Sequence, residues 1–502
     1  MAGTTGGEQM DGAWDRRALL AAGLIFALWA IAPPLVTPNI SLDAAEGLVW
    51  GRGWRLGYEK HPPLQAWLLE ATRVVIGRGP WAHVWLSAAC GALMHLAVWR
   101  GARLLVSPAT AFWASAALQT VFYVNYAIPE FNPNVLLLPV FAGAGWLAIR
   151  ALKFGGARDW IGLGLILGAG MYAKYAAAVV ALVIAGFFVA DPQARRRLAS
   201  PWPYVGAGAA ALAFLPHAAW MLNAGGETVG YVVDRAQIAA GLGGRLANAA
   251  EMLGAVLGTS LLLILAMALG RGGARLSAED APAPAPTSAE RRLVYALALG
   301  PFAVALAMAL IAGFRIKSAW MAPFWTWTPL ALMLVFRIDV TSRAWRRGAA
   351  VIVASAALGL AAFLGANGLG PRLSGEPLRV HFPGRPLAAE LERIWAERAE
   401  GPLPVVIGDT FIAGSAAHYA ASAPVVRDHP DERVNPWASD ALLARTGALI
   451  VWDADVDEGG GAETARYPHA QFVGVLSLDY LAAGVEAPAR VGVAYLPPSP
   501  GE

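Results

Sequence analysis

Long apolar runs recur along the whole chain of 502 residues. A membrane-spanning helix needs about 20 mainly apolar residues, and about eleven stretches of the sequence meet that requirement. Charged residues make up only 15% of the chain, against about 25% in an ordinary soluble domain. The chain is therefore expected to be a polytopic α-helical membrane protein. The expected spans are 18–36, 81–98, 106–124, 134–150, 159–173, 175–190, 203–221, 247–269, 293–313, 319–336 and 348–366.

Two of these runs, 159–173 and 175–190, follow each other with only Lys174 between them. A single span of that length would greatly exceed the thickness of a bilayer. We therefore expect two helices that turn near the membrane surface at Lys174.

Loop arginines and lysines set the orientation, because cytoplasmic loops near span ends carry the excess of positive charge. On this basis the non-cytoplasmic side receives 37–80, 125–133, 222–246, 314–318 and the chain after about residue 367. In a bacterial inner membrane this side is the periplasm, where we expect the chemistry and the C-terminus. The basic residues expected in the cytoplasm include Arg16, Arg17, Arg100, Arg103, Arg150, Lys153, Arg158, Arg195, Arg196, Arg197, Arg271, Arg275, Arg291, Arg292, Arg337, Arg343, Arg346 and Arg347.

The character of the sequence changes after residue 370. The stretches VVIGDTFIAGSAAHYAASAPVV and ALIVWDADV alternate short apolar runs of β type with helical and turn material. Such a pattern is typical of a small α/β domain in water. We therefore expect a membrane domain at 1–369, which includes the first periplasmic loop 37–80, and a periplasmic α/β domain at 370–502.

Composition and motifs exclude several function classes. The formal net charge of +3 is small for this length, so nucleic acid, which requires clustered basic faces, is not an expected partner. The single cysteine, Cys90, rules out an intrachain disulfide and a cysteine-rich metal site. No Walker phosphate loop, HExxH or GxSxG pattern stands in a suitable context, which disfavours nucleotide hydrolysis, metalloproteolysis and α/β-hydrolase chemistry.

The segment 41–70 carries the strongest chemical signal. It contains two amphipathic stretches, separated by Lys60-His61-Pro62-Pro63, which favour helices lying along the membrane interface. Asp43 and Glu46 are three residues apart and share a helical face, so either carboxylate could act as a general base. The spacing equally fits an N-cap at Asp43 completed by Glu46 as a capping box.

Three further polar residues of this loop, Tyr58, Lys60 and His61, stand among tryptophans. One interpretation is an interfacial aromatic belt with a lysine that extends to the membrane surface. The other is a cationic pocket for a lipid phosphate.

The loop NYAIPEFNPN at 125–134 places Glu130, Asn132 and Asn134 close to the membrane on the same side. Irregular polar backbone at that depth normally lines a cavity, although an ordinary Pro/Asn turn fits as well. Glu130 is a candidate second carboxylate or metal ligand.

Charged residues interrupt the apolar pattern at two more places. Lys174 and Tyr175 stand between two apolar runs, where an ionisable group requires a partner such as an anionic head group or must extend to the interface. Arg315 and Lys317 put positive charge on the non-cytoplasmic side, against the general bias. A phosphate-binding role would explain this exception.

The Asp43-x-x-Glu46 pair followed by GYEKHPPLQAWLLE resembles the first extracytoplasmic loop of membrane glycosyltransferases of the C-type (GT-C) fold. The resemblance is strongest to bacterial aminoarabinose and galacturonic acid transferases of lipid A and lipopolysaccharide core, and extends to protein mannosyltransferases. FNPNVLLLPVF, AKY, RIKSAWMAPFW and GDTFIAGSAAHYAASAP follow in the order of that family.

The resemblance implies a catalytic role for Asp43. It also makes Lys60, His61, Lys174, Arg315 and Lys317 candidates for binding the lipid phosphate or donor sugar.

The sequence departs from that family at three positions. Ala44 follows Asp43 where many relatives have a glutamate, and Asn134 stands where a loop acid is common. Ala319 replaces a histidine before the tryptophan matched by Trp320. Either Glu130 substitutes for the loop acid or a second carboxylate is dispensable.

The resemblance therefore implies an inverting transfer of a sugar from a polyprenyl-monophosphate carrier to a lipid or glycolipid of lipid A or lipopolysaccharide type, with Asp43 as general base. The alternatives are a protein acceptor and a non-enzymatic flippase or transporter. No cofactor is expected to be required; a divalent cation held by Asp43 and Glu130 is the open alternative, although hard cations usually take more oxygen ligands. The expected partners are the donor, the acceptor and the surrounding membrane lipids.

Overall fold

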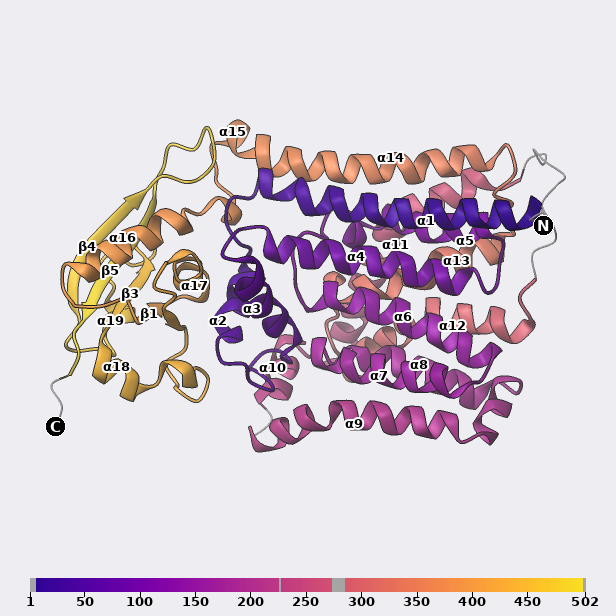
Figure 1. The fold of residues 1–502 in the computed structure, drawn as a ribbon, viewed down its shortest axis with the longest axis horizontal. Helices are drawn as coiled ribbons and strands as arrows, with labels where there is room; N and C mark the ends of the chain where they lie inside the picture. Colours follow the sequence, from indigo (N-terminus) through magenta and orange to yellow (C-terminus); the bar gives the residue numbers. More distant parts are fainter. Residues whose placement is uncertain (1–5, 225–226, 273–284, 500–502) are drawn as a thin grey trace, which may run out of the picture.

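A computed structural model describes residues 6–224, 227–272 and 285–499. Long helices lie side by side through one part of the molecule, and a sheet with its own helices lies beyond one end of them (Figure 1). Within the described ranges, eight helices are long and apolar enough to cross a membrane. These are Gly12–Leu35, Ala82–Ala102, Pro133–Lys153, Trp202–Asn223, Gly241–Gly270, Ser288–Ala312, Ser318–Phe336 and Trp345–Ser374.

Large apolar side chains cover the outside of these helices. Leu212, Leu222 and Leu257 are 71%, 81% and 62% exposed, which is costly in water and favourable in lipid. The helical elements of this part are α1 (Gly6–Ile31), α4 (Ala82–Ala102), α5 (Pro108–Ala116), α6 (Pro133–Lys153), α7 (Ala157–Ala173), α8 (Ala177–Ala190), α9 (Trp202–Asn223), α11 (Gly241–Gly270), α12 (Ser288–Ala307), α13 (Thr328–Phe336) and α14 (Trp345–Leu364).

Three of the eleven expected spans, 106–124, 159–173 and 175–190, are not among the eight long apolar helices of the described ranges. Helices α7 and α8 have only 17 and 14 residues, and 106–124 is not one continuous helix. Helix α5 ends at Ala116 and is followed by 3₁₀ turns at Ala117–Thr120 and Phe122–Val124. The Thr120 hydroxyl donates to the carbonyl of Ala117, and the Asn125 amide donates to that of Gln119. Side-chain donors therefore take carbonyls that a continuing α-helix would use. At Lys174 the structure has the expected break between α7 and α8.

A buried tryptophan fixes the segment that leads into α13. The 3₁₀ segment η6 (Ser318–Trp327) ends at Trp327, which is 1% exposed and donates from Nε1 to the carbonyl of Phe141 at 3.3 Å. A Cβ at Gly101 of α4 or Gly145 of α6 would lie 2.4 Å or 2.0 Å from the Trp327 ring. These two glycines thus make the room that holds η6 between α4 and α6.

Two short helices lie between the membrane helices and the sheet (Figure 1): α2 (Leu42–Gly51) and α3 (Leu64–Ile76). The N-cap of α2 is Ser41, whose hydroxyl accepts from the Ala44 N–H at 3.4 Å. The N-cap interpretation of Asp43 is therefore wrong, because a serine two residues earlier already satisfies the free N–H of the first turn.

The five-stranded sheet has the order β2-β1-β3-β5-β4. Strands β1 and β2 are parallel, as are β1 and β3, whereas β5 is antiparallel to β3 and β4. All four residues of β1 are buried, as expected for a strand covered on both faces. The strands are β1 (Val405–Gly408), β2 (Val425–Arg427), β3 (Ala448–Asp453), β4 (Gln471–Leu478) and β5 (Ala489–Leu496), and the nearby helices are α15 (Gly370–Ser374), α16 (Gly384–Ala396), α17 (Thr410–Tyr419), α18 (Asp440–Thr446) and α19 (Gly461–Thr464).

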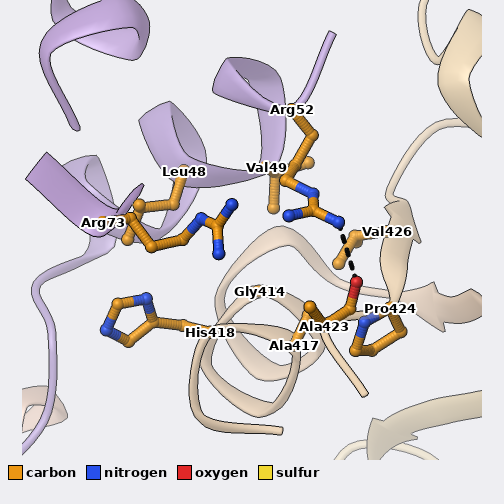
Figure 2. A pocket seen from close by; sticks show the side chains of 10 residues that line it. All are labelled: Leu48, Val49, Arg52, Arg73, Gly414, Ala417, His418, Ala423, Pro424 and Val426. Atoms are coloured by element: carbon orange, nitrogen blue, oxygen red, sulfur yellow. Dashed lines mark hydrogen bonds between the residues drawn. The ribbon is translucent and has the colours of Figure 1, made fainter. Parts of the chain in front are cut away.

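Helix α17 joins this sheet unit to α2, since it packs against both β1 and α2. The side chain of Arg52 reaches from the end of α2 and donates to the carbonyl of Ala423 at 2.9 Å (Figure 2). Arg73 and His418 lie beside this contact and enclose with it a void of about 20 Å³, the volume of about one water molecule. The void is part of the packing between α2, α3 and α17.

Candidate functional site

A cavity of about 740 Å³ lies where α2, the start of α6 and the turn between α7 and α8 meet. Its walls also include η6, the end of α12 and the helix α10 (Glu227–Arg235). Most of the site residues expected from sequence line this cavity: Asp43, Glu46, Lys60, His61, Asn132, Asn134, Lys174, Tyr175 and Trp320. Four segments far apart in sequence thus meet at one place.

Asp43 lies in the first turn of α2 and contributes its side chain to the cavity wall. Burial raises the pKa of Asp43 above its ordinary 3.8, while Lys174, Lys60, Arg379 and the Asn132 side chain oppose that shift. Burial makes the carboxylate a stronger proton acceptor than one at the surface, and the neighbouring cations favour its charged form. Asp43 therefore has the electrostatic setting of a general base.

Glu46 and Lys60 form an ion pair in the same wall. The ammonium of Lys60 donates to Oε1 of Glu46 at 2.6 Å and lies 5.9 Å from the centre of the Trp50 ring. Burial raises the pKa of Glu46 to about 7, although Lys60 opposes this shift. An ammonium has three N–H donors, so Lys60 keeps two for a ligand.

His61 was expected to contribute to a cationic pocket, but burial lowers its pKa to about 3. The imidazole is therefore neutral near pH 7 and can offer a hydrogen bond, without a positive charge. Its ring lies edge-on to that of Tyr231, with the centroids 5.8 Å apart.

Lys174 lies at the turn between α7 and α8, and its ammonium donates to Oδ1 of Asn134 at 2.7 Å. It also lies 5.0 Å from the centre of the Trp320 ring, a cation–π contact. Asn134 is held in place in turn, because the Asn132 side chain caps α6 by accepting from the N–H groups of Asn134 and Val135. The proline-containing loop therefore positions the lysine as well as lining the cavity.

The far half of the cavity is apolar. It runs along two membrane helices, with α8 contributing Ala178, Val179 and Leu182 and α12 contributing Val304 and Ala305. Leu182 is 60% exposed on the outside of the bundle. One cavity therefore combines charged groups from the loops with apolar walls from α8 and α12.

Four residues expected at the site lie outside this cavity. Tyr58 is 1% exposed and stacks on Trp50, with ring centroids 5.4 Å apart. Arg315 pairs at 2.9 Å with the exposed Glu251 of α11, a helix that packs against the elements on either side of Arg315. Lys317 does not line the cavity either.

Glu130, the fourth, lines a second cavity of about 480 Å³ on the other side of Asn132 and Asn134. Burial raises the pKa of Glu130, and the nearby Asp43 carboxylate adds to that shift. The second cavity also has aromatic walls, including Tyr126 and Phe363.

Two arginines were missed by sequence reasoning. Arg235, the last residue of α10, lines the 740 Å³ cavity, and Arg379 lines the second cavity. Neither guanidinium has a hydrogen bond or ion pair with another residue of the described ranges. A signal for Arg235 existed, because it is a basic residue in 222–246, a loop expected on the non-cytoplasmic side, and the same exception singled out Arg315.

Within the described ranges, no group of three or more His, Cys, Asp or Glu side chains is arranged to hold a metal ion. Asp43 and Glu130, the pair considered as metal ligands, line two different cavities.

These features define a polytopic membrane protein with the GT-C fold of membrane glycosyltransferases. The structure of ArnT from Cupriavidus metallidurans bound to undecaprenyl phosphate has the same fold, with a TM-score of 0.62. The match covers 96% of this chain and 98% of that chain at 13% sequence identity. Arabinofuranosyltransferase AftD from Mycobacteria shares the fold over 96% of this chain and 41% of its own length, with a TM-score of 0.51 and 15% identity.

Sequence comparison points the same way. The chain is 27% identical to the lipopolysaccharide core galacturonosyltransferase RgtA of Rhizobium johnstonii, over 92% of this chain and 95% of RgtA. It is 28% identical to the lipid A galacturonosyltransferase RgtD of the same organism, over 42% of this chain and 44% of RgtD. Residues 60–220 match the dolichyl-phosphate-mannose-protein mannosyltransferase family, PMT_2. The resemblance to GT-C glycosyltransferases expected from sequence is confirmed.

Proposed function

We propose that this protein transfers a sugar from a polyprenyl-monophosphate carrier to a lipopolysaccharide or lipid A acceptor at the periplasmic face of the bacterial inner membrane. The observation that carries this proposal is the 740 Å³ cavity, which joins a charged head to an apolar run between α8 and α12. A polyprenyl-phosphate sugar has the same division between a polar head and a long hydrocarbon tail. The similarity to RgtA and RgtD supports the acceptor class.

The donor phosphate is expected to lie among Lys60, Lys174 and Arg235. All three line the polar end of the cavity, and Arg235 has no hydrogen bond or ion pair elsewhere in the described ranges. The polyprenyl chain would then follow the apolar walls of α8 and α12 and leave between them into the bilayer. Charge-assisted hydrogen bonds to phosphate are among the strong ones that a protein can make.

Asp43 would act as the general base of a direct displacement. The acceptor hydroxyl oxygen forms a bond to the anomeric carbon of the donor sugar, while the bond from that carbon to the phosphate oxygen breaks on the opposite face. The hydroxyl proton passes to Asp43, and polyprenyl phosphate leaves. The configuration at the anomeric carbon is inverted, and Lys174 and Lys60 neutralise the charge that grows on the leaving phosphate.

The acceptor is expected to approach from the second cavity. That cavity shares Leu42, Asn132 and Asn134 with the 740 Å³ cavity, which is called the donor cavity from here on. Its aromatic walls suit the acyl chains and sugar of a glycolipid. The acceptor hydroxyl would thus reach Asp43 from the side opposite the donor phosphate, as inversion requires. Glu130 would bind acceptor hydroxyls in this cavity.

A protein acceptor is the second candidate, since residues 60–220 match the protein mannosyltransferase family. The test is therefore transfer from a panel of radiolabelled polyprenyl-phosphate sugars to lipopolysaccharide, lipid A and membrane protein, with the purified full chain. Label in the glycolipid supports the proposal, whereas label in protein alone favours the second candidate. No turnover of any donor would contradict an enzyme and favour a flippase or transporter.

Two variants make the assay specific for Asp43. Asp43→Asn is expected to lower transfer by about 10²–10⁴-fold, the usual contribution of general-base catalysis. Glu59→Gln is the matched control, since it removes a carboxylate of the same loop that does not line the cavity. Transfer that survives Asp43→Asn would remove Asp43 from the mechanism.

A further inference from the structure

A crevice opens in the sheet unit at the carboxyl ends of β1 and β3. These strands are parallel neighbours, with Gly408 paired to Val451. The chain continues from β1 to β2 on one side, whereas β3 lies on the other. Such a switch point leaves a crevice outside the strand ends, where α/β proteins commonly bind ligands. Asp409 follows β1 and caps α17 through its carboxylate, and Asp453 ends β3, so both residues line this crevice.

The crevice is a cavity of about 550 Å³ with polar walls. Asp409, Asp453 and Glu463 supply carboxylates, Tyr480 an aromatic ring and Arg379 a guanidinium. Carboxylates accept hydrogen bonds from hydroxyl groups, and aromatic faces offer apolar surface with a polar edge. This combination matches the alternating hydroxyls and C–H faces of a saccharide. Five carboxylates against two arginines in the lining also disfavour a ligand rich in phosphate.

The crevice is adjacent to the site around Asp43. Leu42, the residue before Asp43, lines all three cavities: the donor cavity, the second cavity and the crevice. Arg379 lines both the crevice and the second cavity, and its charge lowers the pKa of Asp43. A glycolipid whose hydroxyl lies at Asp43 would therefore have its remaining sugars directed toward the crevice.

We propose that this crevice binds the saccharide portion of the acceptor, with Asp453 and Glu463 accepting from sugar hydroxyls and Tyr480 packing against a sugar ring. The proposal rests on the proposed function for the identity of the acceptor. It assigns the soluble unit a role in selecting acceptors by their sugars, while the membrane cavities hold the two lipids.

Binding without turnover tests this role separately from catalysis. The probe is core oligosaccharide released by mild acid from Rhizobium johnstonii lipopolysaccharide, which carries no lipid. Its binding to the full chain in detergent is measured by titration calorimetry. The variants are Asp453→Asn and Tyr480→Ala, singly and together, and the matched control is Asp479→Asn, beside Tyr480 but outside the crevice lining. Thermal melting of each variant shows that its fold is intact.

The wild type, Asp479→Asn and Asp43→Asn are all expected to bind the oligosaccharide, whereas the double crevice variant is expected to bind at least tenfold more weakly. In the transfer assay the same variant should raise the KM for the acceptor and leave the KM for the donor unchanged. Equal binding by the crevice variants and the wild type would overturn the proposal, as would the absence of binding by the wild type. If the wild type binds but transfers no sugar, the proposed function fails while the saccharide site stands.

Discussion

Lys60 and Glu46 form a 2.6 Å ion pair in the wall of the 740 Å³ cavity, one on the loop after α2 and the other on α2 itself. The pair holds a flexible lysine in one position beside Asp43, where a bound phosphate would need it. Because burial raises the pKa of Glu46 to about 7, Glu46 can take up a proton near neutral pH once a phosphate binds the ammonium of Lys60.

We predict that Lys60→Met weakens donor binding. A hydrogen bond to a charged group contributes about 1.5–3 kcal/mol, so the KM for the donor should rise about tenfold to a hundredfold. The measurement is initial rate against donor concentration. Lys153→Met is the matched control. Lys153 forms an ion pair with Glu290, with 3.3 Å between Nζ and Oε1, and it does not line the cavity. An unchanged KM in Lys60→Met would place the phosphate elsewhere.

Arg235 and Arg315 provide a direct comparison between structure and sequence. Arg235→Gln should raise the KM for the donor about tenfold, because its guanidinium lines the cavity and has no partner within the described ranges. Arg315→Gln should leave it within about twofold, because that guanidinium pairs with the exposed Glu251. The measurement is initial rate against donor concentration for both variants, together with inhibition by polyprenyl phosphate that competes with the donor. The reverse order of effects would restore the prediction made from sequence.

The acid limb of the pH–rate profile should respond to Arg379. Asp43 must be ionised to accept a proton, and burial raises its pKa, so activity is lost as pH falls through a value above the ordinary 3.8. The positive charge of Arg379 lowers that pKa. Arg379→Gln should therefore move the limb to higher pH, as measured by kcat/KM from pH 4 to pH 8. Arg385→Gln, whose guanidinium lies over Tyr419, should leave the limb in place.

We expect that a chelator leaves transfer unchanged. Lys60, Lys174 and Arg235 line the polar end of the cavity and can neutralise the leaving phosphate themselves. The measurement is the rate after dialysis against EDTA, compared with the rate after Mg²⁺ or Mn²⁺ is restored. A loss that one of these ions reverses would assign the leaving-group role to a metal.

Gly414→Val should disturb the helix that carries Asp43. A Cβ at Gly414 of α17 would already lie 3.1 Å from Cγ2 of Val49 and 3.4 Å from Cβ of Ala45 on α2. Overpacking of this kind costs about 1–3 kcal/mol, so both the melting temperature and kcat should fall. Gly461→Val is the control, since a Cβ at Gly461 meets nothing within 4 Å. Equal melting temperatures for both variants would show that α17 does not support α2.

The amino-acid sequence by itself was sufficient for the membrane fold and for the place of most cavity residues. Hydropathy acts over about 20 neighbouring residues, so most spans and the break at Lys174 could be predicted without the fold. Asp43, Lys60 and Lys174 were recognisable because an ionisable group at a membrane boundary is costly unless it has a partner or reaches water. The division of the chain at 369/370 stays a prediction.

Tertiary structure decided which charges meet. Arg315 is paired to a glutamate 64 residues away, and Arg235 is left to face the cavity, although the two arginines look alike in sequence. Glu130 lies in a different cavity from Asp43. Arg379 reaches the site because its neighbours Val380 and His381 bond to the chain just before α2. The physical reason is that electrostatic partners are chosen by distance in space, and no local pattern of residues encodes that distance.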